Sequence, residues 1–230
     1  AVPRSIASSC VKKENAMFKL DLHIRSKVRK KLNFAIGKSS ETDRIFHWTR
    51  DDKNRQMERK KYLVVTAGGT GSRMGAGSPK QFLEIGGKAI LQLTIEKFLE
   101  AEPDLKVVVV LPKDHVDSWK KYCYARNFNC PQTLVEGGFT RFHSVKNALA
   151  RINDSNALVA VHDGVRPLVS EALVQKLFET AEDCDAAIPV TAVTDTLKVL
   201  RTNAQGELEE IAGESADRSL LFGAQTPQVF

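Results

Sequence analysis

From Tyr62 onward, short apolar runs that end at glycine or proline alternate with longer segments whose apolar residues recur at helical spacing. Bounded runs of this kind predict buried strands, and the longer segments predict amphipathic helices. Strands that are separated by single helices pair in parallel through right-handed crossovers. The predicted fold is therefore α/β, with a doubly wound, mostly parallel sheet and helices on both of its faces.

The predicted elements fill most of the chain after Tyr62. The strands are expected at residues 62–66, 106–112, 133–138, 157–164 and 186–190. The helices are expected at residues 89–101, 114–127, 141–152 and 170–183, and Asp114 and Ser170 are candidate N-cap residues. Residues 195–214 depart from this pattern, because their alternation and the turn at Gly206 predict a β-hairpin or arm.

The basic character of the chain belongs to its first segment. Residues 1–56 hold 14 of the 34 Lys and Arg but only 6 of the 28 Asp and Glu, so residues 57–230 are near neutral. The net charge of +6 therefore gives no reason to expect that the domain binds nucleic acid. We expect residues 1–56 to be a basic extension, poorly ordered or not native, ahead of a functional domain at 57–230.

No targeting signal or metal-binding spacing stands out in the sequence. No apolar run reaches the ~20 residues that a membrane helix needs, and no apolar core of a secretory signal follows the basic residues. The four cysteines form neither a CxxC pair nor a zinc-spaced cluster, which favours reduced thiols. We therefore expect a cytoplasmic protein that has no membrane partner.

Three loops that carry glycine or charge follow predicted strands. Their sequences are "AGGTGSRMGAGSPKQ" after the first strand, "EGGFTRFHS" after the third and "HDGVRP" after the fourth. In a doubly wound sheet, ligands bind beyond the carboxyl ends of the strands. The convergence of three such loops on one edge predicts a binding site there.

The first of these loops has the chemistry of a phosphate site. It fits neither G-x-G-x-x-G, because Met74 stands at the last position, nor a Walker A loop, because Lys80 follows Pro79. Its glycines let backbone N–H groups approach an anion, while Arg73 and Lys80 add two positive charges. Such a loop suits a triphosphate that is attacked at its α-phosphorus; the alternative is a glycine-rich turn with solvated cations.

The "HDGVRP" loop adds a carboxylate and a guanidinium. Asp163 is a candidate Mg²⁺ ligand, because Mg²⁺ binds few protein carboxylates and takes other ligands from substrate phosphates. Arg166 is a candidate ligand for a second anionic substrate. The alternatives are a turn or cap residue for Asp163 and a surface ion pair for Arg166. We interpret His162 as a packed residue at the strand end rather than a ligand or base.

Five motifs then occur in an order that is typical of one enzyme family: "AGGTGSRMGAGSPKQF", "GGFTRFHSV", "VHDGVRP", "TDTLKV" and "QTPQVF". Over Tyr62 to Phe230, the chain resembles the 2-C-methyl-D-erythritol 4-phosphate cytidylyltransferases of the non-mevalonate isoprenoid pathway. The resemblance implies a Rossmann-like nucleotidyltransferase sheet with a dimerisation arm at 195–218. It also implies transfer of CMP from CTP to the polyol phosphate, release of pyrophosphate, Mg²⁺ as cofactor, and a homodimer.

The resemblance also implies roles for individual residues. The catalytic cations would be Arg73, Lys80 and, from the arm of the partner subunit, Arg218. CTP would bind at Ala67, Gly68, Gly69, Gly138, Arg141 and Ser144. The acceptor phosphate would contact Arg166, Thr196 and Thr226, and Asp163 would coordinate Mg²⁺.

The sequence departs from the family pattern in two places. Gly164 and Val165 stand where the family usually has two alanines, and we expect the backbone path to survive these small changes. Family members also continue past "QTPQ" with further site residues, so we expect residues 57–230 alone to be poorly active. Three alternatives stay open: a ribitol-5-phosphate cytidylyltransferase, a sugar-1-phosphate nucleotidyltransferase, and a non-catalytic module that binds nucleotide or RNA.

Overall fold

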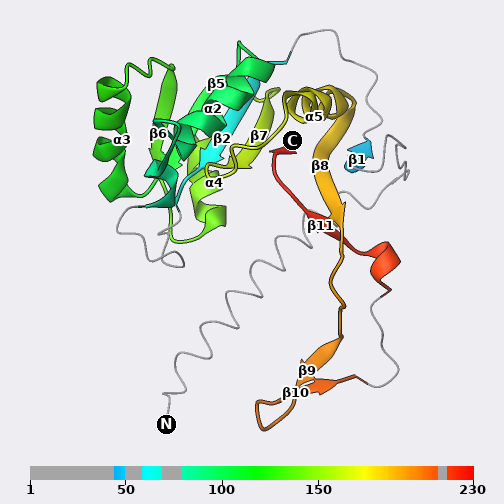
Figure 1. Cartoon of the computed structure of the whole chain (residues 1–230). Helices are drawn as coiled ribbons and strands as arrows, with labels where there is room; N and C mark the ends of the chain where they lie inside the picture. The colour runs from blue at the N-terminus through cyan, green and yellow to red at the C-terminus, as the bar shows by residue number, and fades with distance from the viewer. Residues whose placement is uncertain (1–43, 50–58, 69–78, 212–216) are drawn as a thin grey trace. The chain divides into compact units, whose positions relative to one another are not determined.

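Four parallel strands form the first half of the central sheet. The structure, a computed structural model, describes residues 44–49, 59–68, 79–211 and 217–230. The strands lie side by side in the order β6 (Gln132–Glu136), β5 (Lys106–Leu111), β2 (Lys61–Thr66) and β7 (Leu158–Asp163) (Figure 1). All three pairings are parallel. This confirms the predicted α/β sheet.

Helices cover both faces of these strands. α2 (Ile90–Ala101), α3 (Lys113–Ala125) and α5 (Glu171–Asp183) contribute to one buried core, together with Leu63 and Val65 of β2. α4 (Arg141–Leu149) packs on the opposite face, where Val64 of β2 belongs to a second core. Successive side chains of a strand point to opposite faces, so one apolar strand supplies both cores. The sheet is therefore doubly wound, as predicted.

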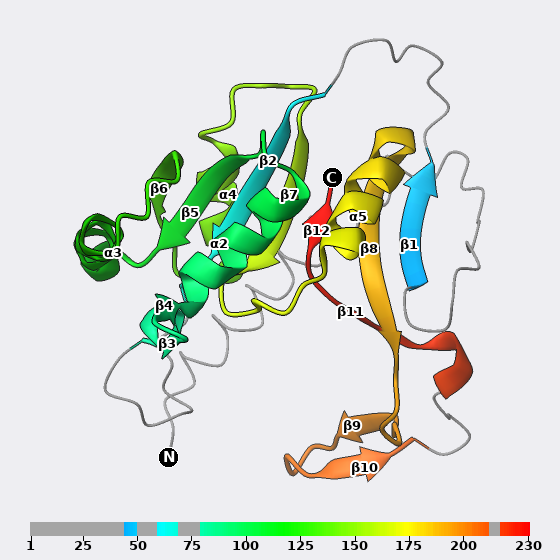
Figure 2. The same ribbon diagram turned by 45° about the horizontal axis from the view of Figure 1, so that its top comes forward.

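The second half of the sheet is antiparallel, which the sequence did not indicate. β8 (Cys184–Ala192) does not pair with β7, because β12 (Gln228–Val229) lies between them and is antiparallel to both (Figure 2). β11 (Phe222–Ala224) also pairs with β8 in antiparallel fashion. Val229 is fully buried and fills the seam between β7 and β8. β8 thus runs in the same direction as β7, as predicted, but it does not pair with β7 directly, because a later segment occupies the place beside β7.

A strand from the predicted extension pairs with the outer edge of β8. β1 (Arg44–Thr49) runs antiparallel to β8, from Arg44 opposite Val190 to Thr49 opposite Cys184. Edge strands expose unpaired backbone groups, and a further strand satisfies them. Six residues of the segment 1–56 therefore belong to the sheet, whereas the expected boundary at Met57 lies outside the described residues.

Residues after β8 form the predicted hairpin. β9 (Leu200–Thr202) and β10 (Leu208–Glu210) pair with each other in a separate two-stranded sheet. Gly206 has a φ of 86°, which favours glycine in this turn. The Asn203 side chain accepts hydrogen bonds from the backbone N–H groups of Gln205 and Glu207. The turn is therefore built as its sequence indicates.

Two other local features position the loops. A small hairpin of β3 (Glu84–Ile85) and β4 (Lys88–Ala89) turns at Gly86 and Gly87, which both have positive φ. Ser170 caps α5 as predicted, by accepting a hydrogen bond from the Leu173 N–H.

The N-cap predicted at Asp114 was wrong. The helix α3 begins at Lys113 directly after Pro112, so Asp114 lies in its first turn. Among the described residues, no helix has both the length and the apolar character to cross a bilayer.

The position of the core predicts that two phenylalanines differ strongly in how much their replacement changes the free energy of unfolding. Phe178 of α5 is fully buried, whereas Phe139 is fully exposed. Replacing Phe178 by Ala should lower the free energy of unfolding by about 3–5 kcal/mol, because the change removes buried area and leaves a cavity. The matched change at Phe139 should alter it by less than ~0.5 kcal/mol. Chemical denaturation measures both, and equal effects would contradict the assignment of the core.

Candidate functional site

Parallel pairing brings the carboxyl ends of the strands to one edge, which we call the C-terminal rim: Glu136, Leu111, Thr66 and Asp163, with the residues that follow each. Thr66 of β2 is aligned with Asp163 of β7, and Leu111 of β5 with Glu136 of β6. Thr226 lies two residues before Gln228, which is aligned with Val161 of β7 in an antiparallel pair. All three loops named in the sequence therefore start from this rim.

An acidic side chain between two guanidinium groups forms the charged part of the rim. Asp163 Oδ2 accepts a hydrogen bond from Arg166 Nε at 3.0 Å, and Asp163 Oδ1 accepts one from Arg141 Nη2 at 3.4 Å. The side chains of Asp163, Arg166 and Arg141 are 28%, 55% and 49% exposed, so solvent and ligands can reach them. One carboxylate against two cations leaves a net positive charge, which favours an anionic ligand. The structure thus brings together three residues that the sequence assigned to the site.

The donor set fits Mg²⁺ only in the company of a phosphate ligand. Within the described ranges, no group of three or more His, Cys, Asp or Glu side chains is placed to hold a metal ion. Asp163 offers one accessible carboxylate at the strand end. Mg²⁺ commonly uses one or two carboxylates and completes its shell with water and substrate phosphates. Asp163 therefore suits a metal ion that arrives with a triphosphate.

The backbone of the turn Asp163–Arg166 is fixed against β2. The Gly164 N–H donates to Thr66 O at 2.9 Å, and the Arg166 N–H donates to Asp163 O at 3.1 Å. A Cβ on Gly164 would lie 2.9 Å from Leu91 Cδ1 and 3.0 Å from Val65 Cγ1. In this chain, Leu91 therefore crowds the space that the alanine methyl group of the family pattern would need.

The loop after β6 is held in a tight conformation at the start of α4. The Gly138 N–H donates to Ser144 Oγ at 3.0 Å, and the Ser144 hydroxyl donates to Thr140 O, also at 3.0 Å. A Cβ on Gly138 would lie only 2.4 Å from His143 Cβ. Gly138 and Ser144 are thus joined directly, and Arg141 in the same loop reaches Asp163. The structure confirms that the second and third loops meet.

The first loop is described only at its two ends. Ala67 is buried, and its N–H donates to Val110 O at 2.9 Å, whereas a Cβ on Gly68 would meet no atom of the described residues within 4 Å. Lys80 begins a short 3₁₀ helix, η2 (Lys80–Phe82), directly after Pro79. Gly69 and Arg73 lie outside the described residues. The roles expected for these residues stay predictions.

Buried polar atoms without a hydrogen-bond partner occur at or next to three of the predicted site positions in the sequence. Among the described residues, such atoms occur in the side chains of Gln81, His162 and Thr226. Gln81 follows Lys80, His162 precedes Asp163, and Thr226 is itself a predicted site residue. Buried polar atoms in folded proteins nearly always have partners, so these atoms stand out among the described residues. Sequence reasoning did not single out Gln81, because a lone glutamine has no motif.

His162 is a packed residue, as the sequence indicated. Its ring is 1% exposed and lies 4.9 Å from the Phe98 ring, measured between centroids. Burial lowers the pKa of His162, because the low-polarity surroundings disfavour the charged imidazolium. The neutral ring keeps one N–H, and Nε2 lies 3.0 Å from Arg166 O, which can only accept. His162 therefore donates from Nε2.

The predicted residues of the arm lie near one another. Arg218 is the first residue of a second 3₁₀ helix, η3 (Arg218–Leu220), and its Nη1 donates to Thr194 O at 3.0 Å. Thr194 lies two residues before Thr196, so Arg218 reaches the base of the arm. Within the described part of the chain, no contact joins Arg218 or Thr196 to Asp163.

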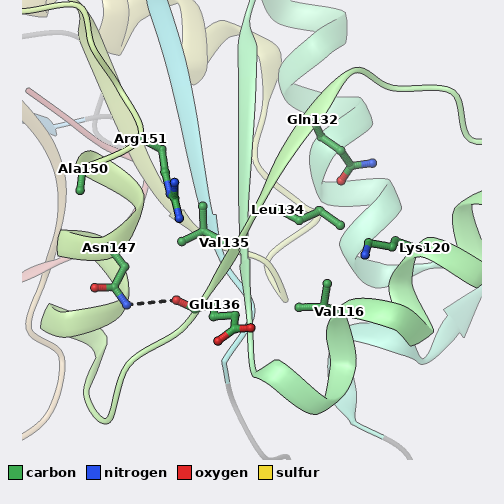
Figure 3. A pocket seen from close by; sticks show the side chains of 9 residues that line it. All are labelled: Val116, Lys120, Gln132, Leu134, Val135, Glu136, Asn147, Ala150 and Arg151. Atoms are coloured by element: carbon green, nitrogen blue, oxygen red, sulfur yellow. Dashed lines mark hydrogen bonds between the residues drawn. The ribbon is translucent and has the colours of Figure 1, made fainter.

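A hollow of about 830 Å³ lies apart from these residues, at the free edge of β6. Figure 3 shows Val116 and Lys120 of α3 on one side of the strand and Arg151, just after α4, on the other. Asn147 Nδ2 donates to Glu136 O at 3.1 Å across one end of this hollow. Of the expected site residues that the structure describes, none lines it. The hollow therefore belongs to the outer edge of the sheet.

Comparison with known proteins gives the family. Residues 62–230 match the family model "IspD: 2-C-methyl-D-erythritol 4-phosphate cytidylyltransferase". The chain belongs to this family. A protein named 2-C-methyl-D-erythritol 4-phosphate cytidylyltransferase from Bacteroides thetaiotaomicron is 41% identical over 171 residues, which cover 74% of each chain. One of the same name from Azobacteroides pseudotrichonymphae is 41% identical over 172 residues, 75% of this chain and 73% of the relative.

A solved structure supports the fold. The crystal structure of 4-diphosphocytidyl-2C-methyl-D-erythritolsynthase from Anaerococcus prevotii matches with a TM-score of 0.59 and 26% sequence identity. The match covers 75% of this chain and 71% of that structure. These findings confirm the resemblance on which the sequence-based assignment to a nucleotidyltransferase family depends.

The tight loop at Gly138 predicts a stability difference between two glycines. Gly138→Ala should lower the free energy of unfolding by about 1–3 kcal/mol, because the new methyl group would overlap His143 Cβ. Gly68→Ala is the matched control, since no heavy atom of the described residues lies within 4 Å of the position of its Cβ. Urea denaturation compares the two, and a Gly138→Ala protein as stable as the wild type would contradict the described loop.

Proposed function

We propose that the chain transfers the CMP group of CTP to 2-C-methyl-D-erythritol 4-phosphate, giving CDP-methylerythritol and pyrophosphate for isoprenoid precursor synthesis. Family membership over residues 62–230 supports this activity. The observation that carries it is the position of Asp163 between Arg141 and Arg166 on the C-terminal rim. This arrangement suits two phosphate-bearing substrates whose negative charges must be brought together.

In the proposed reaction, a phosphate oxygen of the acceptor attacks the α-phosphorus of CTP. The bond from that phosphorus to the pyrophosphate oxygen breaks, and pyrophosphate carries away the electron pair. The acceptor phosphate is already a nucleophile, so no side chain has to remove a proton. The task of the protein is to align the two anions and to neutralise the charge on the transferring group.

Asp163 would hold Mg²⁺ together with the triphosphate, and the bound ion would supply positive charge to the phosphate oxygens. A metal ion on Asp163 would compete with Arg141 and Arg166 for the carboxylate oxygens, so both guanidinium groups would become available to the substrates. Arg141, which starts α4 beside Gly138 and Ser144, would serve the CTP side. Arg166, whose side chain is 55% exposed, would serve the acceptor phosphate together with Thr226.

The remaining base and phosphate contacts are assigned by family resemblance. Ala67, Gly68 and Gly69, together with Gly138 and Ser144, would recognise the cytosine through the backbone and a hydroxyl. Arg73 and Lys80 would bind the triphosphate and stabilise the charge that develops in the transition state. Lys80 follows directly after Pro79, which limits the backbone freedom at the start of η2.

The arm would join two chains into a homodimer, so that Thr196 and Arg218 reach the acceptor site of the partner. The arm carries exposed apolar side chains, among them Leu197 (37% exposed), Leu200 (45%) and Leu208 (71%). Exposed apolar groups on a projecting hairpin are typical of a surface that another chain covers. Since both proposed substrates are water-soluble phosphates, we place the reaction in the cytoplasm.

Replacing Asp163 by Asn tests the proposed site. We expect a loss of kcat/KM on the order of 10²–10³, because the neutral amide binds Mg²⁺ weakly and no longer balances the two arginines. Asp154→Asn is the matched control: Asp154 also pairs with a cation, Lys60 at 3.1 Å, but lies outside the site. Pyrophosphate release from CTP is the measurement, with 2-C-methyl-D-erythritol 4-phosphate and ribitol 5-phosphate as alternative acceptors.

Three results would count against the proposal. Full activity of Asp163→Asn would remove this carboxylate from the mechanism. A preference for ribitol 5-phosphate would replace the acceptor while keeping the cytidylyl transfer. Binding of CTP by the wild-type chain without pyrophosphate release with either acceptor would favour a nucleotide-binding module.

A further inference from the structure

Two buried polar side chains lie beneath the turn Asp163–Arg166. Thr94 of α2 is fully buried, and its Oγ1 lies 3.2 Å from Gly164 O and 2.9 Å from Ile90 O. His162 of β7 is 1% exposed, and its Nε2 donates to Arg166 O at 3.0 Å. Both carbonyl groups belong to the turn that carries Asp163 and Arg166, and neither buried residue has a role in the site described above.

These contacts complete the hydrogen bonds of the turn. The N–H groups of Gly164 and Arg166 already donate to Thr66 O and Asp163 O. The single hydroxyl proton of Thr94 is shared between Ile90 O at 2.9 Å and Gly164 O at 3.2 Å, and the Nε2 proton of His162 goes to Arg166 O, so the C=O groups of Gly164 and Arg166 also have partners. A turn whose backbone is fixed at both residues leaves Asp163 little freedom to change direction. The same holds for Arg166, whose side chain must reach Asp163 Oδ2.

Thr94 and His162 are both connected to helix α2. Thr94 reaches the turn directly, while Phe98, one helical turn later, packs its ring against that of His162. Gly164 brings the turn close to the same helix, since a Cβ there would meet Leu91 Cδ1 at 2.9 Å. A threonine that bonds back to the carbonyl four residues earlier is common in helices and needs no functional reason. Back-bonding within the helix does not explain the second contact of Thr94, which joins it to the carbonyl of Gly164, 70 residues later in the chain.

We propose that Thr94 and His162 are positioning residues that hold the carbonyls of Gly164 and Arg166 and thereby aim the side chains of Asp163 and Arg166 at the substrates. The proposal rests on the proposed function of the Asp163 site. Neither residue touches substrate. Their effect is on the geometry of the two groups that do, and misplacement by about 1 Å can cost on the order of 100-fold in rate.

Two pairs of variants separate positioning from packing. Thr94→Val keeps the shape of the side chain but loses the hydroxyl, whereas Thr94→Ser keeps the hydroxyl. His162→Leu loses the donor, whereas His162→Gln places an N–H donor near the position of Nε2. Thr180→Val is the control for loss of a threonine hydroxyl, because Thr180 Oγ1 bonds only to Lys176 O in its own helix, α5.

The first measurement is amide hydrogen exchange at Gly164 and Arg166, which does not depend on activity. Thr94→Val and His162→Leu should raise the exchange rate of these amides by at least about tenfold, because the turn opens more often. Thr94→Ser and His162→Gln should stay within about threefold of the wild type, and Thr180→Val should leave the turn unchanged. If His162→Leu does not fold, Thr94→Val decides alone, since it preserves the packing volume.

The second measurement is steady-state kinetics with CTP and 2-C-methyl-D-erythritol 4-phosphate. We expect kcat to fall about 10- to 100-fold in Thr94→Val and His162→Leu, and to recover in Thr94→Ser and His162→Gln. Unchanged exchange and unchanged kcat in Thr94→Val would overturn the proposal, as would an equal loss in Thr94→Ser. If the wild type releases no pyrophosphate while exchange responds as expected, the proposed function fails and the anchoring of the turn stands.

Discussion

The parallel pairing of β2 with β7 is the constraint on which the candidate site depends. It aligns Thr66 with Asp163, so that the loops after these two strands start side by side. The same register lets Thr66 O accept the N–H of Gly164, which seats the acidic turn on the neighbouring strand. Asp163 can then lie between Arg166 of its own turn and Arg141 from the loop after β6. The chemistry at the rim is therefore a consequence of strand order.

Local sequence pattern was enough to predict the parallel half of this fold but not its antiparallel half. The strands β2, β5, β6 and β7 are apolar runs bounded by glycine or proline, and their helices have clear spacing, so each could be identified alone. β12 consists only of Gln228 and Val229, too short for any periodic signal, yet it separates β7 from β8. β1 comes from a polar, basic segment and pairs with residues about 140 positions later. Such pairings depend on which sheet edge is free, a property of the assembled molecule.

The residues of the candidate site also divide into those that sequence motifs predict and those whose contacts depend on the folded structure. Asp163, Arg141, Gly138 and Ser144 could be found because their motifs follow predicted strands, and the structure joins them by direct contacts. The role of Thr94 could not be predicted from the sequence, because a small residue on the buried face of an amphipathic helix gives no sign of a contact with a distant loop. His162 was assigned correctly as packed, but its contact with Arg166 O requires the turn to fold back over the strand end.

The central claim is that the metal–triphosphate complex binds at the turn Asp163–Arg166. Paramagnetic broadening of backbone amide signals tests it most directly, with CTP and Mn²⁺ in place of Mg²⁺ added to the ¹⁵N-labelled chain. The account predicts that the amides of Gly164 and Arg166 broaden first, together with Gly138, and that Asp163→Asn abolishes the effect. Selective broadening around Lys120 and Leu134, at the hollow beside β6, with the turn unaffected, would contradict it.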